Sequence, residues 1–258
     1  ENVLPSLALA LLRQGQAQKL VDEFGGTQLQ DPTAQAALRA SVGHAWLLRG
    51  EVKPAAEAFA AAVLAQPDNA SAQLGRARIA AHESRLDDAT ALTDAALKSD
   101  PRLVEGHVFK SQLLMARDQR PSAIESLEKA LAADGSYLPA RLALASLLID
   151  AKDLEKAQTL LGAVGPAGKD PRVQFLLSLL AVRQNDLGKA RDALGGVLTA
   201  APEYGAAPTH TPPKPTSRPL TRFSPSANTV RLSNRPSPSA SSKINTRSRP
   251  LPSGARIG

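Results

Sequence analysis

Apolar residues recur along residues 1–204 with a period of about 34. One position of five successive copies is alanine: Ala55, Ala89, Ala123, Ala157 and Ala190. Four residues later most copies carry a larger apolar residue, at Phe59, Leu127, Leu161 and Leu194, with Thr93 as the exception. Three residues further on lie Ala62, Ala96, Ala130, Val164 and Val197. Because steps of four and three residues return to one side of a helix, the pattern predicts one amphipathic helix in each copy.

A second set of small residues precedes this helix in every copy, at Gly43, Ala77, Ser111, Ala145 and Ser178. Three residues after each of them stand Trp46, Ala80, Leu114, Leu148 and Ala181, and Leu11 holds this place in the first copy. Each unit is therefore predicted to be two antiparallel helices, whose facing small residues let the backbones approach closely. Turns between the two helices are expected at Gly15, Gly50, Ser84, Asp118 and Asn185. Helix starts are expected at Asp31-Pro32, Asp100-Pro101 and Asp170-Pro171, where an N-cap acceptor precedes a proline.

Six units follow from this period, at about 1–35, 36–69, 70–103, 104–137, 138–170 and 171–204. In Gly43, Trp46, Ala55, Phe59, Ala62 and Pro67 the spacing resembles the tetratricopeptide repeat. The resemblance implies an all-α, right-handed solenoid of about six helix-turn-helix repeats. One departure is a polar residue where the repeat has a large apolar one, at Arg39, Gln73, His107 and Arg141, and another is Arg76 and Lys110 before the small residue. We interpret both as local variation, in which long side chains lay their stems on apolar surface.

Two segments are similar to a narrower family. The opening ENVLPSLALALLRQGQAQKLVDEFG and the block LPARLALASLLIDAKDLEKAQTLL resemble the tetratricopeptide-repeat lipoproteins of the PEP-CTERM/exosortase system, which is linked to bacterial exopolysaccharide export. The resemblance implies an exported protein, periplasmic or membrane-anchored. Without it we expect the cytoplasm. The sequence begins with Glu1, so we expect a mature product or an excised fragment.

Residues 205–258 lose the period altogether. They hold ten prolines and ten serines, with nine basic residues and no acidic one, so we expect a disordered basic tail. Three interpretations of this tail stay open. It is an arm that binds nucleic acid or acidic polysaccharide, an inert proline-rich spacer, or an out-of-frame translation, and we favour the last. The net charge of +7 belongs to this tail, because residues 1–204 carry 22 basic and 24 acidic residues, a net of −2.

Nothing in the sequence supports an enzyme. Cysteine is absent, and the four histidines form no metal-binding pair, so we expect neither a metal nor a cofactor. The stretch GAVGPAGKD at residues 162–170 departs from a phosphate loop at its first glycine and after its lysine, and we expect an inter-repeat loop there.

A binding scaffold is the function we predict, because stacked hairpins present an inner surface lined by each unit's first helix. By resemblance to the family, the inward positions are His44, Arg78, Gln112 and Ser146 in one row and His82 and Asp150 in another, with Glu105 nearby. The row lacks the Lys/Asn combination that clamps a C-terminal carboxylate in some tetratricopeptide domains. The expected partner is a protein or an extended peptide, not a small molecule or a nucleic acid; the alternative is polyanion binding by the tail. The last unit has no following helix to cover its apolar face, so we also expect self-association through that end.

Overall fold

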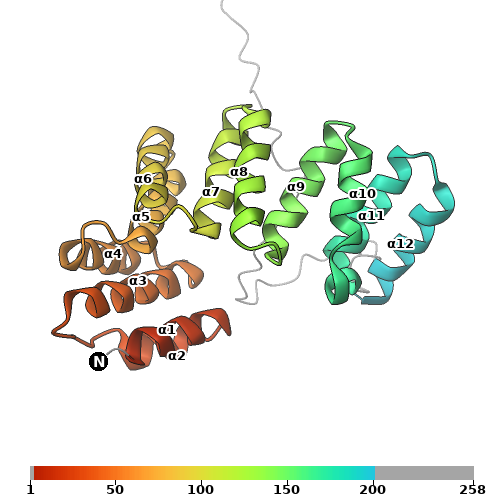
Figure 1. Ribbon diagram of the computed structural model, residues 1–258. Coiled ribbons are helices and arrows are strands. Elements are labelled where there is room, and N and C mark those ends of the chain that lie inside the picture. The colour runs from red at the N-terminus through yellow and green to blue at the C-terminus, as the bar shows by residue number, and fades with distance from the viewer. Residues whose placement is uncertain (1–2, 201–258) are drawn as a thin grey trace, which may run out of the picture. The chain divides into compact units, whose positions relative to one another are not determined.

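Pairs of antiparallel helices build the chain, as Figure 1 shows. The computed structural model describes residues 3–200, except the side chains of 166–167 and 199–200. Within these residues all regular structure is helical: α1 (Val3–Arg13), α2 (Ala17–Phe24), α3 (Pro32–Leu48), α4 (Val52–Ala65), α5 (Ala70–His82), α6 (Leu86–Ser99), α7 (Val104–Ala116), α8 (Arg120–Ala133), α9 (Leu138–Asp150), α10 (Leu154–Gly162), the 3₁₀ helix η1 (Gly165–Lys169), α11 (Pro171–Arg183) and α12 (Leu187–Ala200). The predicted all-α hairpin fold is confirmed. The tail predicted at 205–258 lies outside the described residues.

Small side chains hold the two helices of each hairpin together. The alanine that recurs in the second helix of five successive hairpins is buried in each of them, with 0% exposure at Ala55, Ala89, Ala123 and Ala157. The small residues of the first helices, from Gly43 to Ser178, are buried as well. Each first helix also packs against the second helix of the hairpin before it, as α5 does on α4 and α7 on α6. Neighbouring hairpins therefore bury apolar residues in shared clusters, the largest of which extends from Leu127 to Leu180.

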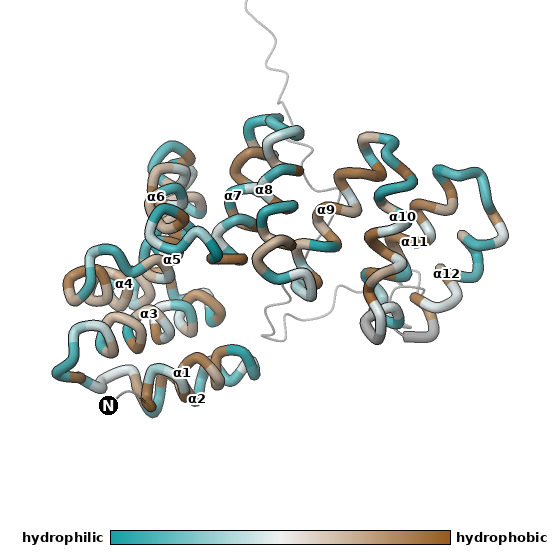
Figure 2. Tube along the Cα trace, viewed as in Figure 1, coloured by the Kyte–Doolittle hydropathy of each residue, from teal (hydrophilic) through white to brown (hydrophobic). Residues whose placement is uncertain are grey.

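The turn inside each hairpin is fixed by one residue in the left-handed conformation. Its φ is positive at Gly15, Gly50, Ser84, Asp118, Lys152 and Asn185. The five turns predicted from sequence are confirmed, and Lys152 adds a sixth that its residue type did not reveal. Figure 2 shows hydrophilic colours at the α11–α12 turn, where the chain leaves the core.

Two of the three predicted helix caps are confirmed and one is wrong. Asp31 accepts a hydrogen bond from the Ala34 backbone N–H at 2.8 Å, and Asp170 accepts one from Arg172 at 2.8 Å. Asp100 instead ends α6, and its side chain accepts from Arg102 in the following turn. Because that turn extends to Leu103, α7 begins at Val104, three residues beyond the proline.

The polar residues at the apolar position of the first helices anchor the loops between hairpins. In three hairpins the side chain donates to the carbonyl six residues earlier: Gln73 to Pro67 at 2.8 Å, Arg141 to Gly135, and Gln174 to Gly168 at 2.5 Å. His107 Nε2 bonds the Pro101 carbonyl at 2.9 Å in the same way. Arg39 bridges two loop carbonyls, those of Gly25 and Thr27, each at 2.6 Å. Our interpretation of these residues as local variation is wrong, because the periodic spacing supplies a periodic loop anchor.

Within residues 3–200 no helix is both long and apolar enough to cross a membrane.

Candidate functional site

A buried phenylalanine brings the first helices of the second and third hairpins close together. Phe59 of α4 is 0% exposed, and its ring lies against the backbones of Gly43 on α3 and Gly75 on α5. A Cβ added at Gly75 would lie 2.2 Å from the ring, and one at Gly43 would lie 2.6 Å from it. The His44 ring meets the Phe59 ring edge-on, with 4.9 Å between centroids. The two glycines thus make room for an aromatic residue that supports His44.

His44 lies in a chain of three polar side chains. Its Nε2 is 3.0 Å from the Ser71 hydroxyl oxygen, and its Nδ1 is 3.5 Å from Nη1 of Arg78. A guanidinium can only donate, so Nδ1 is the acceptor, and the ring proton stays on Nε2 and points to Ser71. Burial, and secondly the nearby charge of Arg78, lower the His44 pKa to about 3. His44 is therefore neutral at physiological pH.

Arg78 extends this chain toward the next two hairpins. Its guanidinium carbon lies 6.0 Å from the centroid of the Phe109 ring on α7. Burial lowers the pKa of Arg78, while Glu105 on α7 and Tyr137, the residue before α9, raise it. Burial also raises the pKa of the Tyr137 hydroxyl, with Glu105 adding to the effect. We call the set His44, Ser71, Arg78, Glu105, Phe109 and Tyr137 the Arg78 cluster.

Three of the seven predicted site residues fall in this cluster: His44, Arg78 and Glu105. The other four do not join it. His82, Gln112 and Asp150 are exposed, Ser146 is partly buried, and none makes a side-chain hydrogen bond or ion pair within the described part of the chain. Of the four residues in the predicted row, only His44 and Arg78 contact each other.

Sequence reasoning missed Ser71, Phe109 and Tyr137. A signal existed for the two aromatic residues, because the whole chain has only five phenylalanines and two tyrosines. Phe109 stands where the neighbouring units have Gly75 and Ala143, and Tyr137 stands where the preceding unit has Leu103. No sequence pattern marked Ser71, whose role depends on the position of His44.

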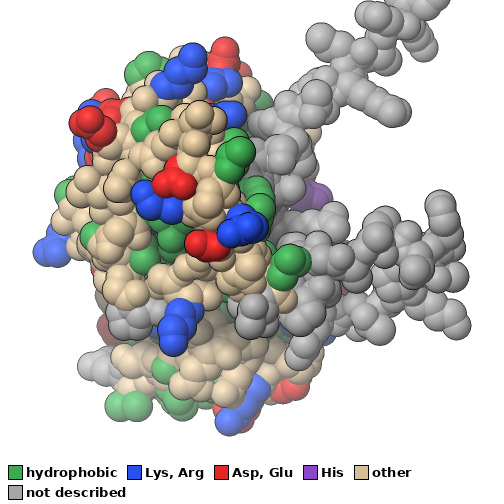
Figure 3. Space-filling view, turned by 90° about the vertical axis from the view of Figure 1, so that its right-hand side faces the viewer, with side chains coloured by type: hydrophobic (Ala, Val, Ile, Leu, Met, Phe, Trp, Pro, Cys, Tyr) green, Lys and Arg blue, Asp and Glu red, His purple; other side chains and the backbone are tan. Residues whose placement is uncertain are grey.

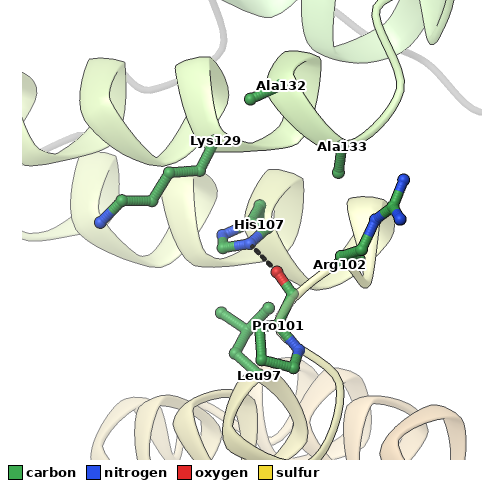
Figure 4. A pocket seen from close by; sticks show the side chains of 7 residues that line it. All are labelled: Leu97, Pro101, Arg102, His107, Lys129, Ala132 and Ala133. Carbon is green, nitrogen blue, oxygen red and sulfur yellow. Dashed lines mark hydrogen bonds between the residues drawn. The ribbon is translucent and has the colours of Figure 1, made fainter.

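A separate pocket of about 390 Å³ lies where the α6–α7 loop meets α8, and Figure 4 shows it. Its lining combines apolar groups with two cations: Leu97, Pro101, Arg102, His107, Lys129, Ala132 and Ala133. His107 serves as the loop anchor, with its Nδ1 buried and unpaired. Lys129 pairs with Glu125 at 2.7 Å, so one of the two cations is already compensated.

No group of three or more potential metal ligands gathers anywhere in residues 3–200.

Family models of the tetratricopeptide repeat match two segments of the chain, residues 49–103 and 114–180. No curated protein sequence matches it.

Several solved structures share the fold at low sequence identity. The structure described under functional characterization of Pseudomonas aeruginosa pilF is 18% identical, with a TM-score of 0.60 over 78% of this chain and 91% of that one. The Cut9–Hcn1 structure of the APC/C is 19% identical, with a TM-score of 0.64 over 78% of this chain and 40% of that one. YrrB, described as having an unusual peptide-binding site, is 15% identical, with a TM-score of 0.52 over 73% of this chain and 94% of that one.

Proposed function

We propose that this chain, in which residues 49–103 and 114–180 match models of the tetratricopeptide repeat, is a scaffold that binds an extended segment of a partner protein along the face formed by its first helices. Tetratricopeptide-repeat proteins generally mediate protein–protein interaction and are typically not enzymes. The observation that carries the proposal is the Arg78 cluster, where four successive hairpins contribute polar and aromatic side chains to one place. YrrB, a structural neighbour, is described as a peptide-binding protein of this fold.

The proposed contact surface includes all seven residues predicted from sequence. His44, Arg78 and Glu105 form its centre, and Gln112 on α7 is its next exposed polar residue. His82, Ser146 and Asp150 extend it along α5 and α9. A peptide in extended conformation spans roughly 3.3 Å per residue, so a segment of about ten residues would reach over several hairpins.

Peptide display tests this proposal without knowledge of the partner. The full chain is used to select from a library of random 12-residue peptides, and the affinity of the best peptide is measured by fluorescence anisotropy. We expect Arg78→Ala or Gln112→Ala to weaken binding about fivefold, or about 1 kcal/mol, with unchanged folding. Arg76→Ala is the matched control, because Arg76 is exposed and lies only two residues from Arg78. Equal binding by all three variants and the parent would place the site elsewhere.

A role in bacterial envelope exopolysaccharide export is the cellular context we propose. Its support is the sequence resemblance of residues 1–25 and 138–161 to PEP-CTERM-associated repeat lipoproteins. Fractionation of the native host tests it, because a protein of this system should appear with the periplasm or membranes. Recovery in the cytoplasm alone would contradict the proposal.

Polyanion binding through residues 205–258 is the alternative, favoured by their nine basic residues. Heparin or DNA binding that falls steeply between low and moderate salt would support it. Binding in the first-helix face should respond far less to salt.

A further inference from the structure

Arg78 is a charged side chain with almost no compensation. A guanidinium has five N–H donors, and Arg78 uses one of them in a long hydrogen bond of 3.5 Å to His44. Two cations in and just after α7 are paired, by contrast: Lys110 with Asp94 at 2.7 Å, and Arg117 with Asp87. Among the described residues no carboxylate forms an ion pair with Arg78, and Glu105 influences it only at longer range. No nitrogen of Arg78 is both buried and unpaired, so its remaining N–H groups reach solvent and can donate to a ligand.

The surroundings of Arg78 hold it ready for such a ligand. His44 Nδ1 accepts from one side, and the ring of Phe109 lies near the guanidinium on another. His44 is itself fixed by Ser71 and by the edge of Phe59. A preorganised guanidinium binds a carboxylate through two parallel hydrogen bonds with little loss of side-chain freedom.

We propose that the Arg78 cluster binds an internal aspartate or glutamate side chain of the partner peptide, next to an apolar residue that contacts Phe109 and Tyr137. This inference rests on the proposed scaffold function and specifies its ligand. The carboxylate pairs with the guanidinium, and the Ser71–His44 pair keeps the guanidinium in place. The cluster draws on four successive hairpins, so first helices continue on both sides of Arg78 and leave room for peptide in both directions.

Charge distinguishes this ligand from a polyanion. The cluster holds one arginine together with the carboxylate Glu105, and residues 1–204 carry a net charge of −2, so this face lacks the run of cations that a nucleic acid or a polyphosphate requires. The one arginine of the cluster can pair with a single carboxylate. The rings of Phe109 and Tyr137 favour an apolar residue next to that carboxylate in the peptide.

A double-mutant cycle between the selected peptide and Arg78 tests this proposal. Random 12-residue peptides selected on the full chain should share an acidic residue with an apolar neighbour. In the best peptide, exchanging that residue for its amide (Glu to Gln or Asp to Asn) should weaken binding about tenfold, and Arg78→Gln should do the same. The two changes together should cost little more than either alone, since each removes the same contact. Arg78→Lys should keep part of the affinity, and Arg76→Gln all of it.

The outcomes separate this inference from the function on which it rests. Peptides that are enriched without a shared acid, or whose binding ignores Arg78→Gln, overturn the carboxylate ligand and leave the scaffold function standing. Loss of binding when the peptide's C-terminus is amidated would assign the contact to a terminal carboxylate and overturn the internal one. Enrichment of no peptide above uncoated beads would remove both proposals.

Discussion

At the scale of single residues, two glycines decide how close the first helices α3 and α5 come to Phe59. Gly43 belongs to the small-residue ladder of the repeat, and Gly75 does not. The Phe59 ring is fully buried, so the packing around it resists a shift. A methyl group at Gly75 must therefore displace the ring or the helix.

We expect Gly75→Ala to destabilise the chain by about 2 kcal/mol, because overpacking exceeds the gain in helix propensity. Urea unfolding followed by circular dichroism measures the change. Gly195→Ala is the control, because an added Cβ in α12 meets nothing within 4 Å. That variant should be neutral or slightly more stable. Equal stability of the two alanine variants would show that the α3–α5 contact is looser than described.

His44 makes stability depend on pH. Its pKa is lowered to about 3 in the folded chain, first by burial and then by Arg78, whereas an unfolded histidine titrates near about 6.5. Between these pH values His44 is protonated in the unfolded chain and neutral in the folded chain. The free energy of unfolding therefore falls as pH drops below about 6.5. The loss at pH 5 should be about 1 to 2 kcal/mol.

Replacement of His44 should remove this part of the pH dependence. We expect His44→Gln to show a smaller fall in melting temperature between pH 7 and pH 5 than the parent. Exposed carboxylates titrate alike in both proteins and cancel in the comparison. Identical falls in melting temperature would mean that His44 takes up its proton in the folded state.

At the scale of elements, the loops between hairpins are held by side chains from the first half of the helices that follow them. Five side chains each donate to a carbonyl of the preceding loop: Arg39, Gln73, His107, Arg141 and Gln174. Arg39 is the most buried of the charged anchors, at 8% exposure, and holds the loop between α2 and α3. Each anchor therefore ties a loop to the helix that follows it.

We expect Arg39→Met to lower stability by about 2 kcal/mol, because two loop carbonyls lose charged donors while the apolar stem is kept. Hydrogen exchange should also rise at residues 25–31. Arg76→Met, at an exposed position of α5, is the control and should change neither quantity. Unaltered exchange in the loop would show that water replaces the guanidinium without loss.

At the scale of the whole molecule, the stack has one end where the repeat's own core position is uncovered. Phe59 is 0% exposed and Leu127 and Leu161 are each 1% exposed, but Leu194 at the same position of α12 is 43% exposed. Leu187 and Leu198 of α12 are exposed with it. Figure 3 views this end and shows hydrophobic side chains among charged ones.

We expect the chain to associate through α12, because each hairpin covers the apolar side of the one before it and α12 has no such cover within the described residues. Light scattering over a concentration series measures it. Leu194→Glu or Leu198→Glu should shift the chain toward monomer, and Leu64→Glu, at an 87% exposed position of α4, should not. A monomer at high micromolar concentration would contradict the prediction.

The repeat made most of the fold predictable. Ala55 and its equivalents, Gly43 and its equivalents, and five of the six turn residues report local conditions that every unit must meet, so spacing alone located the helices. Repeat spacing predicted the residues of the candidate site only in part. Repeat spacing found His44 and Arg78, but it also selected Gln112 and Ser146, which lie in the same row without joining the cluster.

The sequence by itself determined the helical period, the antiparallel pairing and the small-residue contacts, because these depend on residues close together in the chain. Only the tertiary structure decided that Asp100 ends a helix, that Arg39 and Gln73 anchor loops, and that Phe109 and Tyr137 lie near Arg78. Those contacts join different hairpins or join a helix to a loop. Their geometry depends on the angle at which one hairpin stacks on the next, and a one-dimensional period carries no information about that angle.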